Sequence, residues 1–377
     1  MLLARRGYRV LLVDRATFPS DVPAGHYIHH GGTAKLAEWG LLERVVASHC
    51  PAIVKLTMDL GEVRFVVDYR TGMVDFGTFA KRFRPPAPSG AETYSPRRAV
   101  LDQILVEAAV EAGAELREGV RVERVLFDEG RAHGITCRGR GKEPITETAR
   151  VVIGADGRGS LVARSVGAPM HHEQPTLTCG WRSYWSGVDV DGLEYYPREG
   201  RAVLAMPTND GLVWISAGAR REDFAGLRRR PEESYLDIIE LAPRLAERMR
   251  GATREEGITG TGSEPNRLRR PYGPGWALVG DAGYAHDPTS GQGISDAFRD
   301  AELLAQALDE GFSGRRPLVQ ALADYERRRD EAVARTYPVA LELGRLEPVS
   351  AKMLQMFGVL GNEAPAVTQG PAAPVRG

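Results

Sequence analysis

Short apolar runs that end at a turn recur along the chain, with longer segments of apolar residues at helical spacing between them. Three such runs lie at 8–13, 151–153 and 276–279, and an aspartate follows each of them within three residues. Runs of this kind are typical of buried strands in an α/β sheet. Helices are expected at 2–6, 32–39, 101–113, 231–250 and 317–346, from about 160, and from about 291. The order of these elements predicts an α/β fold.

Other strands carry alternating apolar and polar residues, which is typical of half-buried strands. They are expected within 53–76 and at 120–127, 132–138, 181–185, 202–206 and 212–217. Residues 128–131 (DEGR) and 209–211 (NDG) are turn signals between neighbouring strands. The middle of the chain, 176–218, is therefore expected to form a second sheet.

The segment around the third apolar run carries the clearest chemistry. Asp281 follows the strand exit at Gly280, where ligands of α/β sheets bind, and its carboxylate could accept a hydrogen bond from a ribityl or ribose hydroxyl. Gly291 and Gly293 allow the backbone to approach a flat ligand. The helix behind them directs its positive end toward negative charge. This arrangement suits a flavin, whose reduced ring is anionic at one edge.

Residues 275–308 resemble the second FAD-binding motif of the glutathione-reductase-type flavoproteins. The most similar branch is that of the group A FAD-dependent monooxygenases with the aromatic-hydroxylase fold, together with the geranylgeranyl-reductase-like enzymes. Residues 151–168 resemble the DG motif of this family, GADGxxSxVR, and 98–102 resemble its R-x-x-L-D helix start. Arg98 and Asp102 occupy the charged positions of that helix start.

The resemblance implies a glutathione-reductase-type FAD-binding doubly wound sheet with an inserted β-sheet substrate domain and C-terminal helices. The FAD-binding domain would comprise 1–50, 92–170 and 266–316, and the substrate domain 51–91 and 171–265. C-terminal helices would follow at 317–360. The tail 361–377, rich in Ala, Pro and Gly, is expected to be disordered.

The resemblance also implies roles for single residues. Asp14, with Arg15 beside it, would hold the adenosine ribose, Arg98 the FAD phosphates or ribityl oxygens, and Asp281 the ribityl chain. The rest of the expected cofactor-binding set is Asp156, Gly157, Gly280, Pro288, Gly291, Gln292, Gly293 and Ile294. The sequence contains no second G-x-G-x-x-G segment for a stable nicotinamide site. In the family, NAD(P)H docks transiently, reduces the flavin and leaves.

One expected part of this fold is absent from the sequence. Residues 2–6 look like the last turns of a helix that ends at Gly7, and 8–13 then look like the second strand of a dinucleotide fold. The first strand and its G-x-G-x-x-G loop, which should come before them, are missing. We therefore expect the chain to be N-terminally truncated by roughly 20 residues, because a strand, a glycine-rich turn and half a helix need about that many.

The composition limits the possible binding partners and the expected cellular location. The 377 residues carry a net charge of −1 and 42% hydrophobic residues, which indicates a sizeable core and argues against nucleic acid as a partner. Cys50, Cys137 and Cys179 are far apart in the sequence, so neither a disulfide framework nor a zinc site is indicated. No apolar run reaches ~18 residues, hence no membrane span is expected. The expected location is a reducing cytoplasm.

Candidate catalytic residues follow the Gly280-Asp281 turn. His286 or Asp287 could act as an acid or a base, since histidine titrates near neutral pH, but a structural role in the loop is an equal alternative. His29 or His30 is expected near the cofactor, because in the family this loop follows the ribose-binding strand. No histidine group shows metal-site spacing, so no metal is expected.

Three tryptophans on expected strands indicate the substrate pocket. Trp181 and Trp185 share one face of their strand by alternation, and Trp214 lies on another strand. As a group they suggest an apolar or aromatic small molecule as substrate, although ordinary sheet packing is the alternative for each of them alone.

The resemblance implies three readings of the function. The first is an NAD(P)H-dependent monooxygenase that hydroxylates or epoxidises an apolar substrate through a flavin C4a-hydroperoxide. The second is a flavin-dependent reductase of isolated double bonds, in which oxygen is not consumed. The third, which follows from the missing glycine loop, is a fragment that binds no flavin.

Overall fold

Short parallel strands from distant parts of the chain form the nucleotide-binding half of the molecule. The structure, a computed structural model, describes residues 1–22, 25–77, 80–82 and 92–348. Strand β1 (Leu11–Val13) pairs in parallel with β8 (Glu115–Arg117). Strand β12 (Val152–Gly154) pairs in parallel with β22 (Trp276–Leu278), and β21 (Tyr272–Gly273) is antiparallel to β22. Helices lie between the parallel strands in the sequence, so the expected α/β fold class is confirmed.

The two parallel pairs are not joined into one sheet. Among the described residues, β1 has β8 as its only strand partner and β12 has only β22. Leu12 of β1 and Ile153 of β12 line the same cleft. The doubly wound sheet of the prediction is thus present in two parts, and the predicted segment upstream of Met1 stays a prediction.

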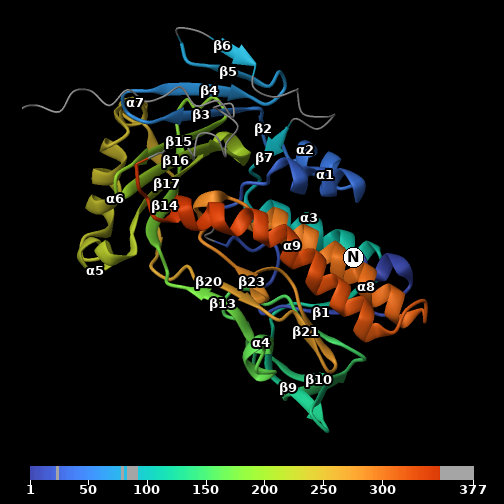
Figure 1. Ribbon diagram of the computed structural model, residues 1–377. Helices are drawn as coiled ribbons and strands as arrows, with labels where there is room; N and C mark the ends of the chain where they lie inside the picture. Colours follow the sequence, from blue (N-terminus) through green and yellow to red (C-terminus); the bar gives the residue numbers. More distant parts are fainter. Residues whose placement is uncertain (23–24, 78–79, 83–91, 349–377) are drawn as a thin grey trace, which may run out of the picture.

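Helices cover these strands with apolar stripes. The long helices α8 (Gly293–Phe312) and α9 (Leu318–Gly344) pack along each other and cross the centre of the molecule (Figure 1). Their buried contact includes Leu304 and Leu308 of α8 and Leu322 of α9, at the helical spacing that makes one continuous stripe. The other helical segments here are η1 (Ala4–Arg6), α1 (His30–Glu38), α2 (Leu42–Ala47), α3 (Arg98–Glu111), α4 (Leu161–Ser165), η4 (Gly280–Ala282) and η5 (Pro288–Ser290).

Smaller sheets complete this half. The predicted hairpin is confirmed, because β9 (Val120–Asp128) and β10 (Arg131–Gly139) are antiparallel and β11 (Ile145–Thr148) adds to β10. Glu129 and Gly130 at its turn both have positive φ, 45° and 78°, as a type I′ turn requires. The remaining strands are β2 (Ala52–Ile53) with β7 (Thr93–Tyr94), and β13 (Met170–Gln174) with β20 (Asn266–Arg269) and β23 (Tyr284–Ala285).

A ten-stranded sheet, called here the large sheet, forms the other half of the molecule. Its order is β18-β14-β17-β16-β15-β3-β4-β5-β6, with β19 also paired to β14. The parallel pair of β15 and β3 joins two segments that are far apart in the sequence. The bounds are β3 (Lys55–Asp59), β4 (Arg64–Asp68), β5 (Met73–Asp75), β6 (Ala80–Arg82), β14 (Thr178–Ser186), β15 (Leu193–Arg198), β16 (Arg201–Pro207), β17 (Val213–Arg220), β18 (Thr253–Arg254) and β19 (Thr259–Thr261). The expected second sheet is confirmed, and the domain boundaries stay a prediction.

The helical part of the sequence between β17 and β18 differs from its prediction. One helix was expected at 231–250, but α6 (Pro231–Glu240) ends before Leu241 and α7 (Pro243–Arg248) begins two residues later. Pro243 causes the break, because proline has no N–H and disfavours helical backbone at the preceding residue. Pro338, by contrast, lies within the single continuous helix α9. Short segments η2 (Asn209–Gly211), η3 (Arg221–Asp223) and α5 (Phe224–Leu227) complete the structure.

The two faces of the large sheet have different neighbours. Helices α5, α6 and α7 cover one face, called here the back face (Figure 1). The other, the cleft face, opens onto the main cleft. Strand alternation sends consecutive residues to opposite faces, so in β15 Tyr195 lines the cleft whereas Tyr196 packs with α6.

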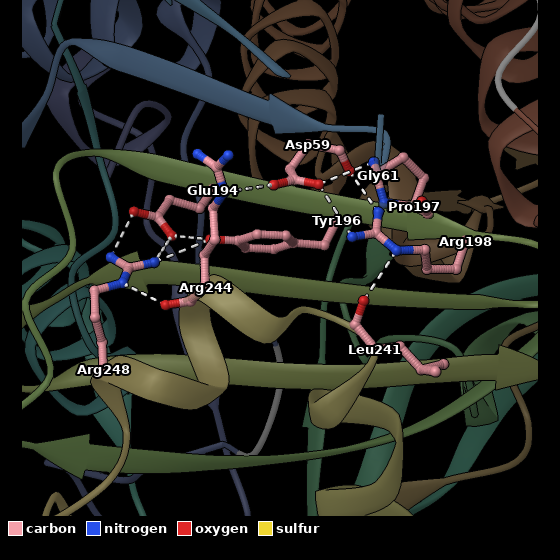
Figure 2. Close-up of polar contacts among 9 residues, drawn as sticks. All are labelled: Asp59, Gly61, Glu194, Tyr196, Pro197, Arg198, Leu241, Arg244 and Arg248. Carbon is pink, nitrogen blue, oxygen red and sulfur yellow. Dashed lines mark hydrogen bonds and ion pairs between the residues drawn. The ribbon is translucent and has the colours of Figure 1, made fainter. Parts of the chain in front are cut away.

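Buried ion pairs join the back face to its helices. Figure 2 shows Glu194 of β15 bound by Arg248 of α7, with N···O distances of 2.9 and 2.5 Å, and by the Tyr196 hydroxyl, which donates to it at 2.5 Å. On β3, the Asp59 carboxylate accepts from Arg198 at 3.0 Å, and the Arg198 Nε also donates to the backbone oxygen of Leu241 at 2.9 Å. Glu194 and Asp59 are 4% and 5% exposed, so both charges depend on these partners.

Candidate functional site

One cleft brings the predicted cofactor residues together. It has a volume of about 2410 Å³ and lies between the parallel strands and the cleft face of the large sheet. Asp14, which follows β1, and Asp281, which follows β22, both line it, although 267 positions separate them. Other predicted residues in its lining are Arg15, Arg98, Asp156, Gly157, Gly280, Pro288, Gly291, Gly293 and Ile294. Gln292, the N-cap of α8, is the one member of the predicted cofactor-binding set outside the lining.

Asp281 lies where β22 gives way to the short helix η4. Gly280 before it has a φ of 58°, a backbone conformation that side chains disfavour, and a Cβ there would lie 3.3 Å from the Cβ of Ala297. Burial raises the pKa of the Asp281 carboxyl above its usual value, against the opposing effects of His286 and Arg158. A half-buried carboxylate that faces the cleft is suited to accepting hydrogen bonds from ligand hydroxyls.

Gly291 allows a tight approach between two segments of the wall. It follows η5 with a φ of 67°, and a Cβ there would lie 3.3 Å from the His29 Nε2. The His29 Nε2 donates to the Ser290 carbonyl oxygen at 3.0 Å. Burial lowers the pKa of His29 to about 4, so the ring is neutral at neutral pH. The N-terminus of α8 borders the cleft immediately after this contact, through Gly293 and Ile294.

The loop before α1 supplies an aromatic wall that was only partly anticipated. His29 and His30 line the cleft as expected, and Tyr27 and Tyr69 line it as well. Tyr27 packs edge-on against His29 at 4.6 Å between ring centroids, and His30 against Tyr69 at 4.7 Å. Tyrosines in irregular segments carry no motif that would have identified them from the sequence.

Arg98 and Asp156 line the cleft but also have partners within the protein. Arg98 donates from Nε and Nη2 to both oxygens of Asp102, at 2.9 and 2.8 Å, across one turn of α3. Asp156 accepts from the backbone N–H of Leu161 and Val162, and so fixes the start of α4. Their expected contacts with FAD stay predictions.

His286 lines the cleft and is held by acceptors at both ring nitrogens. Its Nδ1 is 2.9 Å from the Asp287 backbone oxygen, and its Nε2 is 3.3 Å from an Asp296 carboxylate oxygen. Burial alone would lower the pKa of His286, but the hydrogen bond and charge of Asp296 outweigh it, so the pKa is raised. Asp296 is also paired with Arg299 at 2.6 Å. Of the two catalytic candidates, His286 is therefore the one that faces the cleft.

Asp287, the other catalytic candidate, is fully buried and lies outside the cleft lining. Its carboxylate accepts from the Thr178 hydroxyl at 2.7 Å and from the Thr289 backbone N–H at 3.1 Å. Its own N–H donates to the Asn266 side-chain oxygen at 2.7 Å. These contacts cap η5 and tie the loop to the large sheet, which favours the structural alternative, and the acid–base role of Asp287 stays a prediction.

The three tryptophans of the predicted substrate pocket lie on two different faces of the large sheet. Trp214 lines the cleft, whereas Trp181 and Trp185 lie on the back face. Trp185 donates from Nε1 to the Tyr235 hydroxyl of α6 at 2.9 Å, and Trp181 stacks on Phe224. The shared face of Trp181 and Trp185 was predicted correctly, but it is the face that the helices cover.

Metal sites and membrane-spanning helices are both absent from the described residues. No group of three His, Cys, Asp or Glu side chains there is placed to hold a metal ion. None of the helices in this part of the chain has the length and apolar content that a bilayer crossing requires. The three cysteines are all buried as free thiols.

Comparisons with known proteins agree with this geometry. A family described as FAD binding domain matches residues 1–338. Digeranylgeranylglycerophospholipid reductase 2 of Methanopyrus kandleri is 28% identical over 69% of this chain and 68% of its own length. The 6-methylpretetramide 4-monooxygenase of Streptomyces rimosus is 24% identical over 95% of this chain and 81% of its own. The structure of a myxobacterial FAD-dependent chondrochloren halogenase has a TM-score of 0.80 at 21% identity, over 93% of this chain and 83% of that one.

Proposed function

Because the chain belongs to the FAD-binding domain family, we propose that it is an NAD(P)H-dependent monooxygenase that hydroxylates or epoxidises an apolar small molecule. The family and its relatives are FAD-dependent enzymes, among them monooxygenases, reductases and halogenases. FAD is the cofactor, and NAD(P)H is the reductant typical of this family. Monooxygenation and the apolar substrate are the part that we propose.

One observation carries the proposal. The cleft that contains Asp14 and Asp281 continues over the cleft face of the large sheet, where Leu204, Met206 and Trp214 form an apolar wall. A flavin held by the two carboxylates would thus share one cleft with an apolar ligand. Apolar walls keep water away from the reacting groups, which suits monooxygenation because water promotes side reactions of reactive intermediates.

The residues of the cleft would bind and orient the reactants. When bound, the flavin supplies hydride acceptance from NAD(P)H and activation of oxygen. Asp14 would accept hydrogen bonds from the adenosine ribose and Asp281 from the ribityl chain. The N-terminus of α8 would stabilise negative charge at the pyrimidine edge of the flavin. His286, whose pKa Asp296 helps to raise, would hold a proton at the same side of the cleft.

The test measures oxygen uptake and NAD(P)H oxidation by the FAD-loaded protein with a panel of apolar aromatic and isoprenoid compounds. We expect some of these compounds to accelerate both rates equally and to gain one oxygen atom, labelled when ¹⁸O₂ is supplied. Asp281→Ala should lower flavin content, whereas Asp237→Ala, at an exposed position outside the cleft lining, serves as the matched control. Substrate-dependent NAD(P)H oxidation without labelled product would contradict monooxygenation.

A reductase of isolated double bonds is the second candidate. The similarity to a digeranylgeranylglycerophospholipid reductase favours it. Product formation without oxygen, with two hydrogens added per NAD(P)H consumed, would identify this activity. If the purified chain takes up no FAD at all, both activities fail and the fragment reading is correct.

A further inference from the structure

His29 is held at the point where two helices of the cleft wall begin. It is the N-cap of α1, and its backbone N–H donates to the Ser295 hydroxyl, in the first turn of α8, at 3.1 Å. Gly32, three residues further along the chain, packs so closely on Ser295 that a Cβ there would lie 2.6 Å from the Ser295 Oγ. The start of α1 is therefore fixed against the start of α8, and the His29 side chain extends from a rigid support.

The imidazole ring of His29 is fixed as well. Its Nε2 lies 3.0 Å from the Ser290 carbonyl oxygen, and the ring packs edge-on against Tyr27 at 4.6 Å between centroids. Glycine at position 291 leaves room for this contact, because a Cβ there would already lie 3.3 Å from the His29 Nε2. A ring held in this way needs little rearrangement when a ligand binds, which favours binding.

The contact with Ser290 determines which ring nitrogen carries the proton. A carbonyl oxygen only accepts hydrogen bonds, so the N–H of the ring is at Nε2. Burial lowers the pKa of His29 to about 4, so the ring binds no second proton at neutral pH. Nδ1 is therefore an unprotonated nitrogen, which can accept a hydrogen bond and cannot donate one.

Nδ1 of His29 is also open to the cleft. No described residue donates a hydrogen bond to it, and it is not among the enclosed polar atoms that lack a partner. His29 itself is half-buried and lines the cleft. His26 and His286 differ from it, because both of their ring nitrogens face partners within the protein. His29 thus keeps one acceptor atom for a ligand.

We propose that Nδ1 of His29 accepts a hydrogen bond from an N–H or O–H group at the edge of a ligand bound in the cleft. The N-terminus of α8 borders the cleft beside it through Gly293 and Ile294, and the first N–H groups of a helix are donors. This part of the wall therefore fits a ligand edge on which acceptor and donor groups alternate. The flavin has such an edge, with one ring N–H between two carbonyl groups, and a substrate with a hydroxyl group would supply the same donor. In the second case the inference rests on the proposed function.

Two amide substitutions separate the roles of the two ring nitrogens. His29→Asn places an amide oxygen on Cγ, where Nδ1 is attached, so it keeps the acceptor but does not reach Ser290. His29→Gln places an amide nitrogen at the position of Nε2, so it keeps the donor to Ser290 but has no acceptor in place of Nδ1. Ligand binding by Nδ1 predicts that the Asn variant resembles the wild type. A purely structural role of the Ser290 contact predicts that the Gln variant does.

The first arm of the test measures the affinity of the full chain for FAD. Flavin fluorescence during titration with protein gives the dissociation constant for the wild type and both variants. If the flavin N–H is the donor, His29→Gln should weaken binding about three- to tenfold, as for the loss of one neutral hydrogen bond, and His29→Asn should stay within about twofold. His172→Gln, at an exposed position outside the cleft lining, is the control.

The second arm compares two probes with one ring system, 2-naphthol and 2-methoxynaphthalene. Isothermal titration calorimetry of the FAD-loaded protein measures the affinity of each. If a substrate hydroxyl is the donor, the wild type should prefer 2-naphthol about three- to tenfold, and His29→Asn should keep most of this preference. His29→Gln should bind both probes equally. The affinity for 2-methoxynaphthalene should be the same in all three proteins, since this probe has no donor.

The order of the variants decides the outcome. An effect in either arm with the Gln variant impaired and the Asn variant close to the wild type supports the proposal, and the arm identifies the ligand that carries the donor. Unchanged binding by His29→Gln in both arms would overturn the proposal, as would equal impairment of both variants or the reverse order. A wild-type chain that binds neither FAD nor either probe would overturn it as well.

Binding and turnover can fail independently. If a ligand is recognised through Nδ1 but oxygen is never incorporated, the monooxygenase proposal fails and the role of His29 stands. If the protein oxygenates a compound and both variants bind FAD and the probes as the wild type does, the role of His29 fails and the monooxygenase proposal stands.

Discussion

The two faces of the large sheet bury polar groups in opposite ways. The back face buries full charges in fixed pairs, such as Glu194 with Arg248. On the cleft side a buried group is neutral instead: burial lowers the pKa of His26, which stacks on Tyr184 of the cleft face, to about 3. Fixed helices can supply a permanent counter-charge, whereas a wall that must accept a ligand cannot depend on one. Neutral hydrogen-bonded groups cost less to desolvate than charged groups do, so they suit the face whose surroundings change when a ligand binds.

His26 shows how the cleft face achieves this. Its Nδ1 lies 2.7 Å from the Ser95 hydroxyl, and its Nε2 lies 3.0 Å from the Tyr184 hydroxyl. It also packs edge-on against Trp214, which lines the cleft. Both ring nitrogens are thus satisfied without charge, and the loop that carries the aromatic wall is anchored to the sheet.

The largest expected effect comes from breaking the back-face pairing. Arg248→Met leaves the buried Glu194 with only the Tyr196 hydroxyl, and we expect a loss of about 3–5 kcal/mol in the free energy of unfolding, as for a buried charge without its partner. Urea unfolding measures this loss. Arg244→Met is the matched control: its side chain is 67% exposed and lies 4.0 Å from Asp59, so a change within about 0.5 kcal/mol is expected. Equal losses of unfolding free energy in both variants would contradict the view that the buried charges of the back face depend on their paired partners.

The sequence predicted the strands of the large sheet better than it predicted which of the two faces the helices cover. Alternation placed Trp181 and Trp185 together correctly, because side chains of a strand alternate whatever it packs against. The register pairs Tyr184 with Trp214 and places both on the cleft face. On β17 the small and branched apolar residues Val213, Ile215 and Ala217 share the back face, but alternation alone does not say which neighbour covers that face.

The residues of the candidate site were predictable from the sequence where they belong to recognisable motifs. Asp14, Asp281 and the glycines before α8 occupy positions that strand exits and turns dictate, and they meet in one cleft. Arg97, the N-cap of α3, is paired with Asp21 at 2.6 Å and lies over the Tyr184 ring at 4.6 Å. Contacts of this kind join segments distant in sequence, and only the assembled fold places them.

A second prediction concerns the stability of the protein at acid pH, where the neutral His26 side chain would have to take up a proton. The pKa of His26 in the folded protein, about 3, lies below its unfolded value of about 6.5, so the unfolded state binds the proton first as pH falls. The stability that His26 contributes is therefore complete above about pH 6.5 and is lost below it, by up to about 1.4 kcal/mol per pH unit.

Urea unfolding of the wild type and of His26→Gln across this pH range measures the effect. The variant should lose less stability on acidification than the wild type does, although it starts from a lower value. His172→Gln, at an exposed position, should follow the wild-type dependence. Parallel curves for the wild type and His26→Gln would show that the buried imidazole is not the source of the acid sensitivity.

The smallest expected effect separates the tryptophans of the two faces. Trp185→Phe removes the hydrogen bond to the buried Tyr235 hydroxyl, and we expect a loss of about 1–2 kcal/mol in the free energy of unfolding, with no change in the binding of a neutral aromatic probe, 4-phenyl-1-butanol, to the FAD-loaded protein. Trp214→Phe changes the cleft wall, so it should weaken binding of that probe a few-fold while stability changes less. Calorimetry and urea unfolding of both variants test the pair together. If Trp185→Phe impaired binding as much as Trp214→Phe, the covered face would take part in ligand recognition, and the division of roles between the faces would be wrong.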